Sequence, residues 1–569
     1  MPDVAISPAL RRTILRVFTK KHNLQLHSSA VAFIAHTLDS HGLIDQPEEW
    51  DDAIEALATG ILEAEASGAD PGVSSSVVTQ EALKHVYDQL CMADSAGGAA
   101  GASTTATTIS QAIHDLTEGE RPNPDRYFHV INAFDMPRVV FDPQRKVFER
   151  SSVRPTILPA ASAKSAYLRQ RLSIVRSAIQ RNENFCPPLA VGQGRQRDSF
   201  MKLTSTKNLL GRQGQRFLLF GMLSTSHDGR YVLEDADGSV GLDLQDAIPG
   251  EGIFTEGAMI LVEGEYTDEE RIKVFALGHP PSETRKQARQ LYAHIDMLGI
   301  GAISSRDEEA LRAHEQMHDD LCIVVISDLH LDHPKTMANF KLMLQGYVDA
   351  DFIPFAFVLC GNFSSSPWTG GDMLKRYQTA FGNLADLIGG FPELLRSSHF
   401  VLVPGPTDPF VTPLMPRPAL PEILTTKLKA KLGARVHFAS NPCRIAYFGQ
   451  EIVVYRDGIM ARMLRNSVRL KEEAREGDLK KFLVSTLLDQ AHLCPLPQTV
   501  RPVLWEHDHA LRLYPMPTAL VLADTYDRFE LTYEGCHVFN PGSFRGSSFG
   551  WSTYYPASGR MERSELPQV

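Results

Sequence analysis

The sequence is poor in cysteine and has none of the cysteine spacings that bind zinc. Its seven cysteines lie far apart, are odd in number and form no C-x-x-C pair. A zinc ribbon needs thiolates paired at short spacing, and a disulfide framework needs an even set of cysteines in a short secreted chain. We therefore expect a reducing compartment and no structural metal. No G-x-x-x-x-G-K-[ST] motif or dinucleotide fingerprint surrounds Gly361, Gly405 or Gly542, so we expect no nucleotide-binding loop and no cofactor. The cysteines are Cys91, Cys186, Cys322, Cys360, Cys443, Cys494 and Cys536.

Positive charge is also in deficit. The chain has 57 Lys and Arg residues against 68 Asp and Glu residues, so its formal net charge is −11. Proteins bind nucleic acid largely by neutralising phosphates with Lys and Arg. The acidic balance therefore argues against a polybasic DNA-binding protein and favours protein partners.

Long apolar runs are missing as well. The longest apolar stretch, around residues 352–360, is too short to cross a bilayer. The first 18 residues indicate an amphipathic helix without the apolar segment of a signal peptide. We therefore expect neither a secreted protein nor a membrane-spanning one.

What is present suffices for several domains. The chain of 569 residues is about four times as long as an average domain, and 43% of its residues are apolar. Within residues 10–92 the apolar positions recur at helical spacing, so we expect four short helices packed as a bundle. Residues 93–108, ADSAGGAAGASTTATT, lack large apolar side chains and indicate a flexible tether.

Residues 217–278 have the period of β-strands instead. Apolar and polar residues alternate around Val240, and the Asp-Gly pair at residues 237–238 is typical of a hairpin turn. The succession of short strands resembles the oligonucleotide-binding (OB) fold. The only basic residue between residues 228 and 270 is Arg230, so the barrel favours a structural or protein-binding role over DNA binding.

From residue 321 onward, apolar strands alternate with polar loops and helices, as in layered α/β folds. We expect strands near residues 322–326, 355–359, 400–403 and 519–523. Each of them delivers polar residues at its carboxyl end, where α/β sheets place ligands. The polar residues at these ends, together with one further candidate histidine, are Asp328, His330, Asn362, Thr407, Asp408, His492, Asp524, Thr525 and Asp527.

This arrangement resembles the calcineurin-like metallophosphoesterase superfamily, whose motifs are D-x-H, G-D-x-x-D, G-N-H-[DE], a lone His and G-H-x-H. In that family two metal ions share a bridging carboxylate and hold the hydroxide that attacks a phosphate ester. The resemblance covers roughly the last 250 residues. It assigns Asp328 and His330 to the first motif and His492 to the lone histidine.

The same resemblance implies that the ligand set is broken. Asn362 stands in place of the bridging Asp, Pro406 in place of a ligating Asn, and Thr407 in place of the general-acid His. Thr525 and Asp527 stand in place of the last His pair. A neutral amide does not offset two dications, and a threonine hydroxyl donates no proton near neutral pH. We therefore expect no catalytic residue, only vestigial positions. They are Asp328, His330, Asn362, Pro406, Thr407, Asp408, His492, Thr525 and Asp527.

Longer strings extend the resemblance over nearly the whole chain. They are FHVINAFDMPRVVF (128–141), VVISDLH (324–330), TLLDQAHLCPL (486–496), ALRLYPMPTALVLADTYD (510–527) and FNPGSF (539–544). With the domain order, these strings resemble the B-subunit family of replicative DNA polymerases, and its epsilon branch in particular. The B subunits of polymerases alpha and delta share the barrel and the inactive phosphoesterase core.

The expected fold class is therefore multidomain α+β. The resemblance implies a helical bundle similar to the lid of AAA+ ATPases, an OB-type barrel, and a calcineurin-like α/β sandwich phosphoesterase domain. The expected limits are residues 1–92 for the helical domain, 93–120 for the linker, 121–198 for an extended and helical connector, 199–285 for the barrel and 286–569 for the phosphoesterase domain.

The resemblance also implies a non-catalytic role in the nucleus. The barrel and the phosphoesterase domain are expected to grip the zinc-containing C-terminal region of the polymerase epsilon catalytic subunit. The helical domain is expected to dock on the GINS component of the CMG helicase, with DNA reached only through the complex. A flexible linker would then keep the polymerase concentrated near leading-strand DNA.

Other functions stay open at this point. One is a B subunit of polymerase delta or alpha. Another is a residual metal-dependent phosphodiesterase, in which Asp328, His330 and His492 hold one weak metal. A third is a single-strand DNA-binding module, suggested only by the OB-like barrel.

Overall fold

The computed structural model of the chain divides into two compact units, Met1–Thr105 and Ala106–Val569. No helix in the described part is both long enough and apolar enough to cross a membrane. The predicted tether, residues 93–108, and the rest of the linker to residue 120 lie outside the described residues. The structure describes residues 7–22, 24–40, 50, 54–55, 57–59, 61, 77–78, 83–84, 121–186, 201–367, 370–409, 412–471, 476–546 and 548–566.

The first unit begins with helices, as predicted. Ser7 caps the first helix, and its side-chain oxygen accepts a hydrogen bond from the backbone N–H of Leu10 at 3.1 Å. Helices at the first two predicted positions are confirmed, whereas a short parallel strand pair was not predicted. The elements are α1 (Pro8–Leu15), a π-helical turn (Arg16–Lys21), β1 (Gln25–Leu26), α2 (Ser28–Ser40) and β2 (Val77–Val78).

The third and fourth predicted helices are described only in fragments. Trp50, Ile54, Leu57 and Ile61 are buried in one apolar cluster with residues of α1 and α2. The packing of four helices as a bundle stays a prediction. The described residues of these two segments are helical, namely residues 50, 54–55, 57–59, 61 and 83–84.

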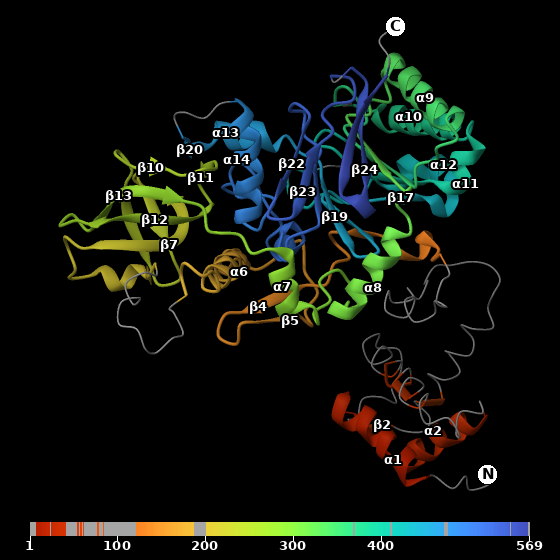
Figure 1. Cartoon of the computed structure of the whole chain (residues 1–569), viewed down its shortest axis with the longest axis horizontal. Coiled ribbons are helices and arrows are strands. Elements are labelled where there is room, and N and C mark those ends of the chain that lie inside the picture. The colour runs from red at the N-terminus through yellow and green to blue at the C-terminus, as the bar shows by residue number, and fades with distance from the viewer. Residues whose placement is uncertain are drawn as a thin grey trace. The chain divides into compact units, whose positions relative to one another are not determined.

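The second unit contains the predicted barrel. Its strands follow one another in the order β13-β12-β7-β8-β9, and a parallel pairing of β13 with β9 closes the ring (Figure 1). The predicted turn at residues 237–238 joins the antiparallel strands β8 and β9, so this hairpin is confirmed. The strands are β7 (Arg216–Thr225), β8 (Tyr231–Glu234), β9 (Ser239–Asp243), β12 (Met259–Tyr266) and β13 (Arg271–Gly278), with the short strands β6 (Leu203–Thr204), β10 (Ile248–Pro249) and β11 (Phe254–Thr255) beside them.

Two six-stranded sheets make up the rest of the core. The first has the order β17-β16-β15-β14-β24-β25, and the second has the order β22-β23-β21-β19-β18-β3. The strands of the first sheet are β14 (Ile323–Ser327), β15 (Ala356–Cys360), β16 (His399–Val403), β17 (Val436–Phe438), β24 (Gly550–Tyr555) and β25 (Arg560–Glu565). Those of the second are β3 (Phe128–Asn132), β18 (Cys443–Tyr447), β19 (Gln450–Tyr455), β21 (Ala519–Leu522), β22 (Phe529–Tyr533) and β23 (Cys536–Asn540).

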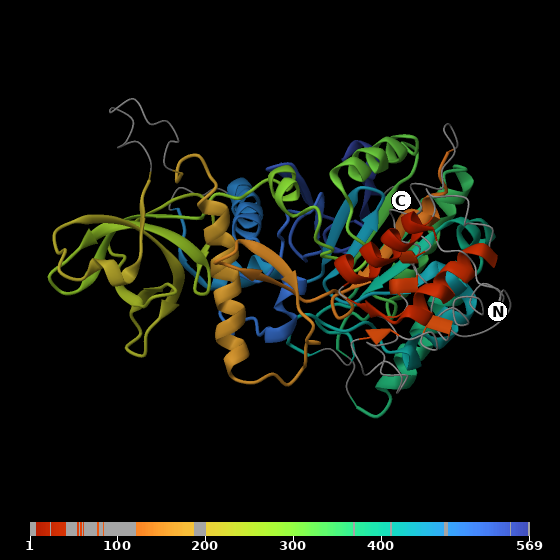
Figure 2. The ribbon, with the colours of Figure 1, turned by 90° about the horizontal axis from the view of Figure 1, so that it is seen from below.

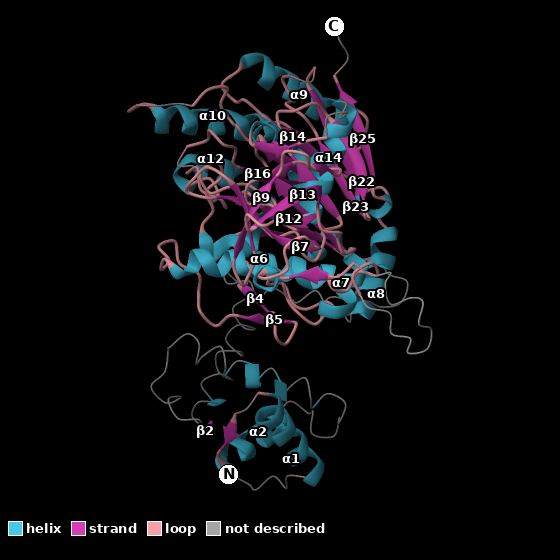
Figure 3. Cartoon of the chain, turned by 90° about the vertical axis from the view of Figure 1, so that its left-hand side faces the viewer, coloured by secondary structure: helices cyan, strands magenta, loops and turns pink. Residues whose placement is uncertain are grey.

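The two sheets pack face to face with helices on the outside. Side chains of β14, β15 and β16 meet those of β18, β19 and β21 in one apolar layer. The central strands are buried along their whole length, which explains their continuous apolar sequences. Figure 3 shows α9, α10 and α12 outside the strands. The helices are α9 (Pro334–Asp349), α10 (Met373–Ile388), α11 (Pro392–Ser397) and α12 (Glu422–Leu432) on the first sheet, and α13 (Ile459–Arg465) and α14 (Glu476–Asp489) on the second.

A long helix, α6 (Ser162–Ile179), lies between the barrel and the sandwich (Figure 2). It lies within residues 121–198, where the sequence analysis expects an extended and helical connector. Leu172 and Val175 pack on the barrel, while Ile174 packs on the hairpin that precedes the helix. The neighbouring elements are β4 (Val139–Asp142), β5 (Val147–Arg150), α7 (Arg285–Tyr292), α8 (Ser305–Gln316) and β20 (Ser467–Arg469), which pairs with β11.

Candidate functional site at the strand ends

Three loops of the first sheet meet at the carboxyl ends of their strands, as the sequence predicted. Asp328 follows β14, Asn362 follows β15 and Thr407 follows β16. The backbone N–H of Asn362 donates to Asp328 Oδ1 at 3.2 Å. The backbone N–H of Thr407 donates to Asn362 Oδ1 at 2.9 Å. The Asn362 amide therefore holds two loops together as an ordinary hydrogen-bond partner.

The centre of this cluster is an arginine that the sequence analysis missed. Arg456 directly follows β19 in the second sheet, and only 1% of its surface is exposed. Its Nη2 donates to Asp328 Oδ1 at 2.5 Å, its Nη1 donates to the carbonyl oxygen of Ala523 at 3.0 Å, and its Nε donates to the carbonyl oxygen of Gly361. Burial opposes its charge, but the attraction of Asp328 and of other neighbouring groups together raises the pKa of Arg456. A fixed cation therefore lies against the carboxylate.

Asp408 fastens the loop after β16. Its Oδ1 accepts the backbone N–H of Phe363 and its Oδ2 accepts that of Gly405, each at 2.7 Å. Burial raises the pKa of Asp408 to about 6. Both of its oxygens are thus committed to the backbone, and the neighbouring Pro406 brings no side-chain donor or ligand.

His330 lies at the edge of the cluster. Its Nε2 is 3.9 Å from Asp328 Oδ1, beyond hydrogen-bonding distance. Burial lowers the pKa of His330, so the ring is largely neutral near pH 7. The Asp328 oxygen nearest this ring, Oδ1, accepts a hydrogen bond from Arg456 instead.

His492 does not join the cluster, which corrects its assignment as a partner of Asp328. Its Nδ1 accepts the backbone N–H of Cys494 at 3.0 Å, so its Nε2–H donates to Asp508 Oδ1 at 3.1 Å. Its charged neighbours are Arg171, Asp508 and Arg512, and none of them contacts Asp328. His492 is a buried structural histidine of a different part of the unit.

The last predicted pair is also displaced. Thr525 and Asp527 are exposed, whereas Asp524 is buried. The carboxylate of Asp524 accepts backbone N–H groups of Met460 at 2.9 Å and of Tyr526 at 3.1 Å, and these bonds turn it inward. The side chain that the end of β21 (Ala519–Leu522) delivers to the interior is therefore Asp524.

These residues do not fit a metal centre. Among the residues that the structure describes, no group of three or more His, Cys, Asp or Glu side chains is placed to bind a metal ion. The one buried carboxylate that matches the first motif, Asp328, is neutralised by the Arg456 guanidinium. A dication placed there would meet a fixed positive charge.

Comparison with known proteins decides the family. A family described as the B subunit of DNA polymerases alpha and epsilon matches residues 323–531. Another, described as DNA polymerase epsilon subunit 2-like, OB-fold domain, matches residues 161–281. The DNA polymerase epsilon B subunit of Schizosaccharomyces pombe is 32% identical over 571 residues, covering 96% of this chain and 94% of that protein. The chain belongs to the family of DNA polymerase epsilon B subunits.

Animal members of this family are similar as well. DNA polymerase epsilon subunit 2 of Homo sapiens is 35% identical over 468 residues, covering 81% of this chain and 87% of that protein. That of Mus musculus is 35% identical over 470 residues, with the same two shares. The resemblance to the epsilon branch and the OB fold of the barrel are thus confirmed.

The comparison with a solved structure is much weaker than the comparisons of sequence. An archaeal phosphodiesterase aligns with 43% of this chain at 12% identity and a TM-score of 0.25. So weak a likeness leaves the calcineurin-like assignment of the sandwich a prediction.

Proposed function

We propose that the chain is a non-catalytic scaffold subunit of DNA polymerase epsilon, built on a phosphoesterase-like sandwich whose chemistry has been lost. The observation that carries the loss is the ion pair of Arg456 with Asp328, at 2.5 Å. In a two-metal phosphoesterase the cations at such a carboxylate are the metals, and they activate the attacking water. A guanidinium supplies charge and hydrogen bonds there, but it binds no water for attack.

The scaffold role requires a surface for the catalytic subunit, and the N-terminal half of α6 supports one. Cavities of about 440 and 430 Å³ flank this half of the helix, and Tyr167 lines both. The loop before the helix exposes Val153, Ile157 and Leu158, of which Leu158 is 90% exposed. Trp505 lines the first cavity. Exposed apolar and aromatic side chains beside grooves are typical of protein interfaces.

The partner that we assign to this surface is the C-terminal region of the catalytic subunit. The experiment is affinity purification of the tagged chain from its native cells at moderately high salt, with mass spectrometry of the proteins that remain bound. We expect a very large polymerase polypeptide in near-equal amount. Recovery of the folded chain alone would contradict the scaffold role.

Variants then locate the contact. Ile157→Asp with Leu158→Asp should release the polymerase, because it places two charges in the proposed contact. Both side chains are exposed in the chain alone, so the substitutions should leave its fold intact. Ile248→Asp is the matched control, since Ile248 is 72% exposed on β10 of the barrel. Equal recovery of the polymerase by both variants would exclude the α6 surface as the contact.

The N-terminal unit completes the proposed role in the nucleus. We assign residues 1–92 as the helical domain that docks on GINS of the CMG helicase and residues 93–120 as the linker. The connector (121–198), the barrel (199–285) and the inactive phosphoesterase domain (286–569) would remain on the polymerase during DNA replication. Deleting residues 1–92 should release the helicase and keep the polymerase in the purification. Loss of both partners would contradict this division of tasks.

A further inference from the structure

The segment that forms the loop before α6 and α6 itself has no acidic residue. Residues 150–182 contain seven Lys and Arg residues and no Asp or Glu. The whole chain has 68 Asp and Glu among 569 residues, so a segment of this length would carry about four. This is the surface to which the scaffold role assigns the catalytic subunit, so its charge bears on the chemistry of whatever covers it.

Three cations of this segment are available to a partner. Arg150, Arg154 and Arg169 are exposed, and none of them forms an ion pair with another described residue. Arg169 lines the cavity of about 440 Å³. The loop reaches the same cavity, because the backbone N–H of Thr156 donates to Glu506 Oε2 at 2.7 Å and Glu506 is part of the lining. The loop and the helix therefore present their cations at one cavity.

The carboxylates that line this cavity are already held from the interior. Glu506 Oε1 lies 3.7 Å from Arg138 Nη1, and its other oxygen accepts the bond from the loop. Asp508 is only 3% exposed and accepts the Nε2–H of His492 at 3.1 Å. Among the described residues of the lining, no other is acidic.

The barrel brings two further carboxylates near the cavity, at the turn between β8 and β9, where Ala236 is part of the lining. Both are committed within the barrel. The oxygens of Asp235 accept the backbone N–H of Thr206 at 2.8 Å and its hydroxyl at 2.7 Å. Asp237 pairs with Lys207 Nζ at 3.0 Å. The described acids around the cavity thus leave the three arginines uncompensated.

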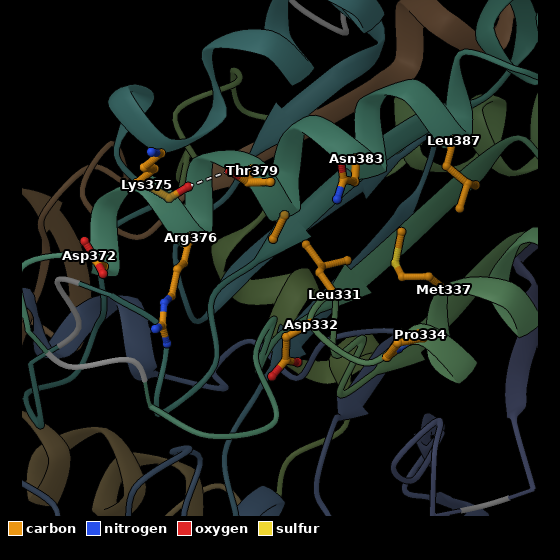
Figure 4. A pocket seen from close by; sticks show the side chains of 11 residues that line it. Leu331, Asp332, Pro334, Met337, Asp372, Lys375, Arg376, Thr379, Asn383 and Leu387 are labelled. Carbon is orange, nitrogen blue, oxygen red and sulfur yellow. Dashed lines mark hydrogen bonds between the residues drawn. The ribbon is translucent and has the colours of Figure 1, made fainter.

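Two other hollows of the unit have no such excess. A groove of about 730 Å³ lies between α10 and the loop that joins β14 to α9 (Figure 4). Lys375 and Arg376 lie at one end of this groove, where Asp332 and Asp372 balance them. The second cavity at α6 is lined by two cations of the helix and by two glutamates of the barrel. The excess of positive charge therefore distinguishes the first cavity.

We infer that the segment of the catalytic subunit that covers the first cavity is acidic and carries large aliphatic side chains, an inference that rests on the scaffold role proposed above. Its aliphatic side chains pack on Ile157 and Leu158, which are 63% and 90% exposed. Its carboxylates pair with Arg154 and Arg169. Apolar burial supplies the affinity, and the charges set the orientation and exclude basic segments.

The same surface does not suit single-stranded DNA, which is also an anion. Proteins bind single strands by stacking the bases on exposed aromatic side chains. The two aromatic residues that line the first cavity, Tyr167 and Trp505, are buried and half-buried, and the large exposed side chains of the loop are aliphatic. An apolar centre with a charged rim is instead typical of a protein interface.

The test reverses the charge of this surface on the full chain. Arg154→Glu with Arg169→Glu is introduced into the tagged chain, which is purified from its native cells as above. Recovery of the polymerase should fall at least about tenfold, whereas Arg154→Lys with Arg169→Lys should keep most of it, because the charge is preserved. The matched control is Lys375→Glu with Arg376→Glu, which makes the same change at two exposed cations of the α10 groove and should leave the recovery unchanged.

The outcomes separate this inference from the scaffold role. Release of the polymerase by Ile157→Asp with Leu158→Asp but not by Arg154→Glu with Arg169→Glu would overturn the acidic segment and keep the contact. Equal loss in the two charge-reversed variants would show non-specific attraction and would also overturn it. Recovery of the unaltered chain alone would overturn the scaffold role itself, and this inference with it.

A second measurement addresses DNA. Fluorescence anisotropy of the purified full chain with fluorescein-labelled oligothymidylate should show no saturable binding at moderate salt. Binding that Arg154→Glu with Arg169→Glu abolishes would overturn the inference, in favour of single-stranded DNA as the occupant.

Discussion

Arg456 Nη2 lies 2.5 Å from Asp328 Oδ1, and this buried ion pair joins the two sheets of the sandwich. Asp328 follows β14 of the first sheet, and Arg456 follows β19 of the second. The remaining donors of the guanidinium reach the carbonyl oxygens of Gly361 and Ala523, which also end strands of different sheets. The arginine therefore holds the strand ends of the two sheets together, as a bound metal would, but it does not supply the chemistry of a metal.

Removing this arginine should destabilise the sandwich strongly. Arg456→Ala leaves the Asp328 carboxylate and two carbonyl oxygens without their donors in a buried place, so the free energy of unfolding should fall by about 3–5 kcal/mol. Arg456→Lys should recover little of it, because an ammonium does not reproduce the planar fork of three separate donors. Urea unfolding followed by circular dichroism measures both losses.

A paired replacement is the control for that loss. Arg456→Met with Asp328→Leu removes both charges together and should cost less than Arg456→Ala alone. If Arg456→Ala unfolds at the same urea concentration as the unaltered chain, the ion pair does not hold the sheets together.

The stability of the loop after β16 should depend on how many acceptor oxygens the side chain at position 408 offers. Asp408→Ala orphans the buried N–H groups of Phe363 and Gly405, which predicts a loss of about 2–5 kcal/mol in the free energy of unfolding. Asp408→Asn keeps one acceptor oxygen and should lose less. A larger loss for Asn than for Ala would contradict this account of the loop.

The sequence predicted most of the fold because its signals are local. Continuous apolar runs mark buried strands, and polar residues directly after them mark the sheet edge. The meeting of Asp328, Asn362 and Thr407 was therefore predictable, and the structure has it. The barrel was predictable for the same reason, since a period of two and an Asp-Gly turn need no knowledge of distant residues.

The partners across the site were not predictable in this way. Arg456 ends an apolar strand in the string EIVVYRD, but nothing local shows that it crosses to the other sheet. His492 matched a motif position by order along the chain, yet its ring is held by Asp508. At the end of β21, Asp524 turns inward because its carboxylate accepts the backbone N–H groups of Met460 and Tyr526. Met460 is far from Asp524 in the sequence, and Tyr526 lies just after it.

The side chain of Gln490 joins the sandwich to the barrel through two hydrogen bonds to the backbone of Met259. Its Oε1 accepts the N–H of Met259 at 2.6 Å, and its Nε2 donates to the carbonyl oxygen of Met259 at 2.6 Å, as a strand would. Gln490→Ala should therefore lower the free energy of unfolding by about 2–4 kcal/mol and speed proteolysis between the two parts. Gln245→Ala, on an exposed side chain of the barrel, is the control and should change neither. Equal proteolysis of both variants would show that this contact does not fasten the barrel.

The buried ring of His492 makes stability depend on pH. Burial lowers its pKa from 6.5 to about 4. Between these two values the unfolded chain binds a proton at this residue and the folded chain does not, so the free energy of unfolding falls as the pH falls from 6.5 toward 4. At pH 5 the loss from this group is about 2 kcal/mol relative to pH 7. Burial lowers the pKa of His437 and of His509 to about 4 as well, so the group must be isolated by substitution.

His492→Gln isolates it, because the amide accepts from Cys494, donates to Asp508 and does not titrate in this range. The variant should lose less stability than the unaltered chain when urea unfolding is measured at pH 7 and then at pH 5. His227→Gln is the control. His227 is an exposed histidine outside the sandwich, so this substitution should leave the pH dependence of the free energy of unfolding unchanged. If His492→Gln and the unaltered chain lose the same amount between the two pH values, the ring is protonated in the folded state, and the hydrogen bond from Cys494 to its Nδ1 does not persist in solution.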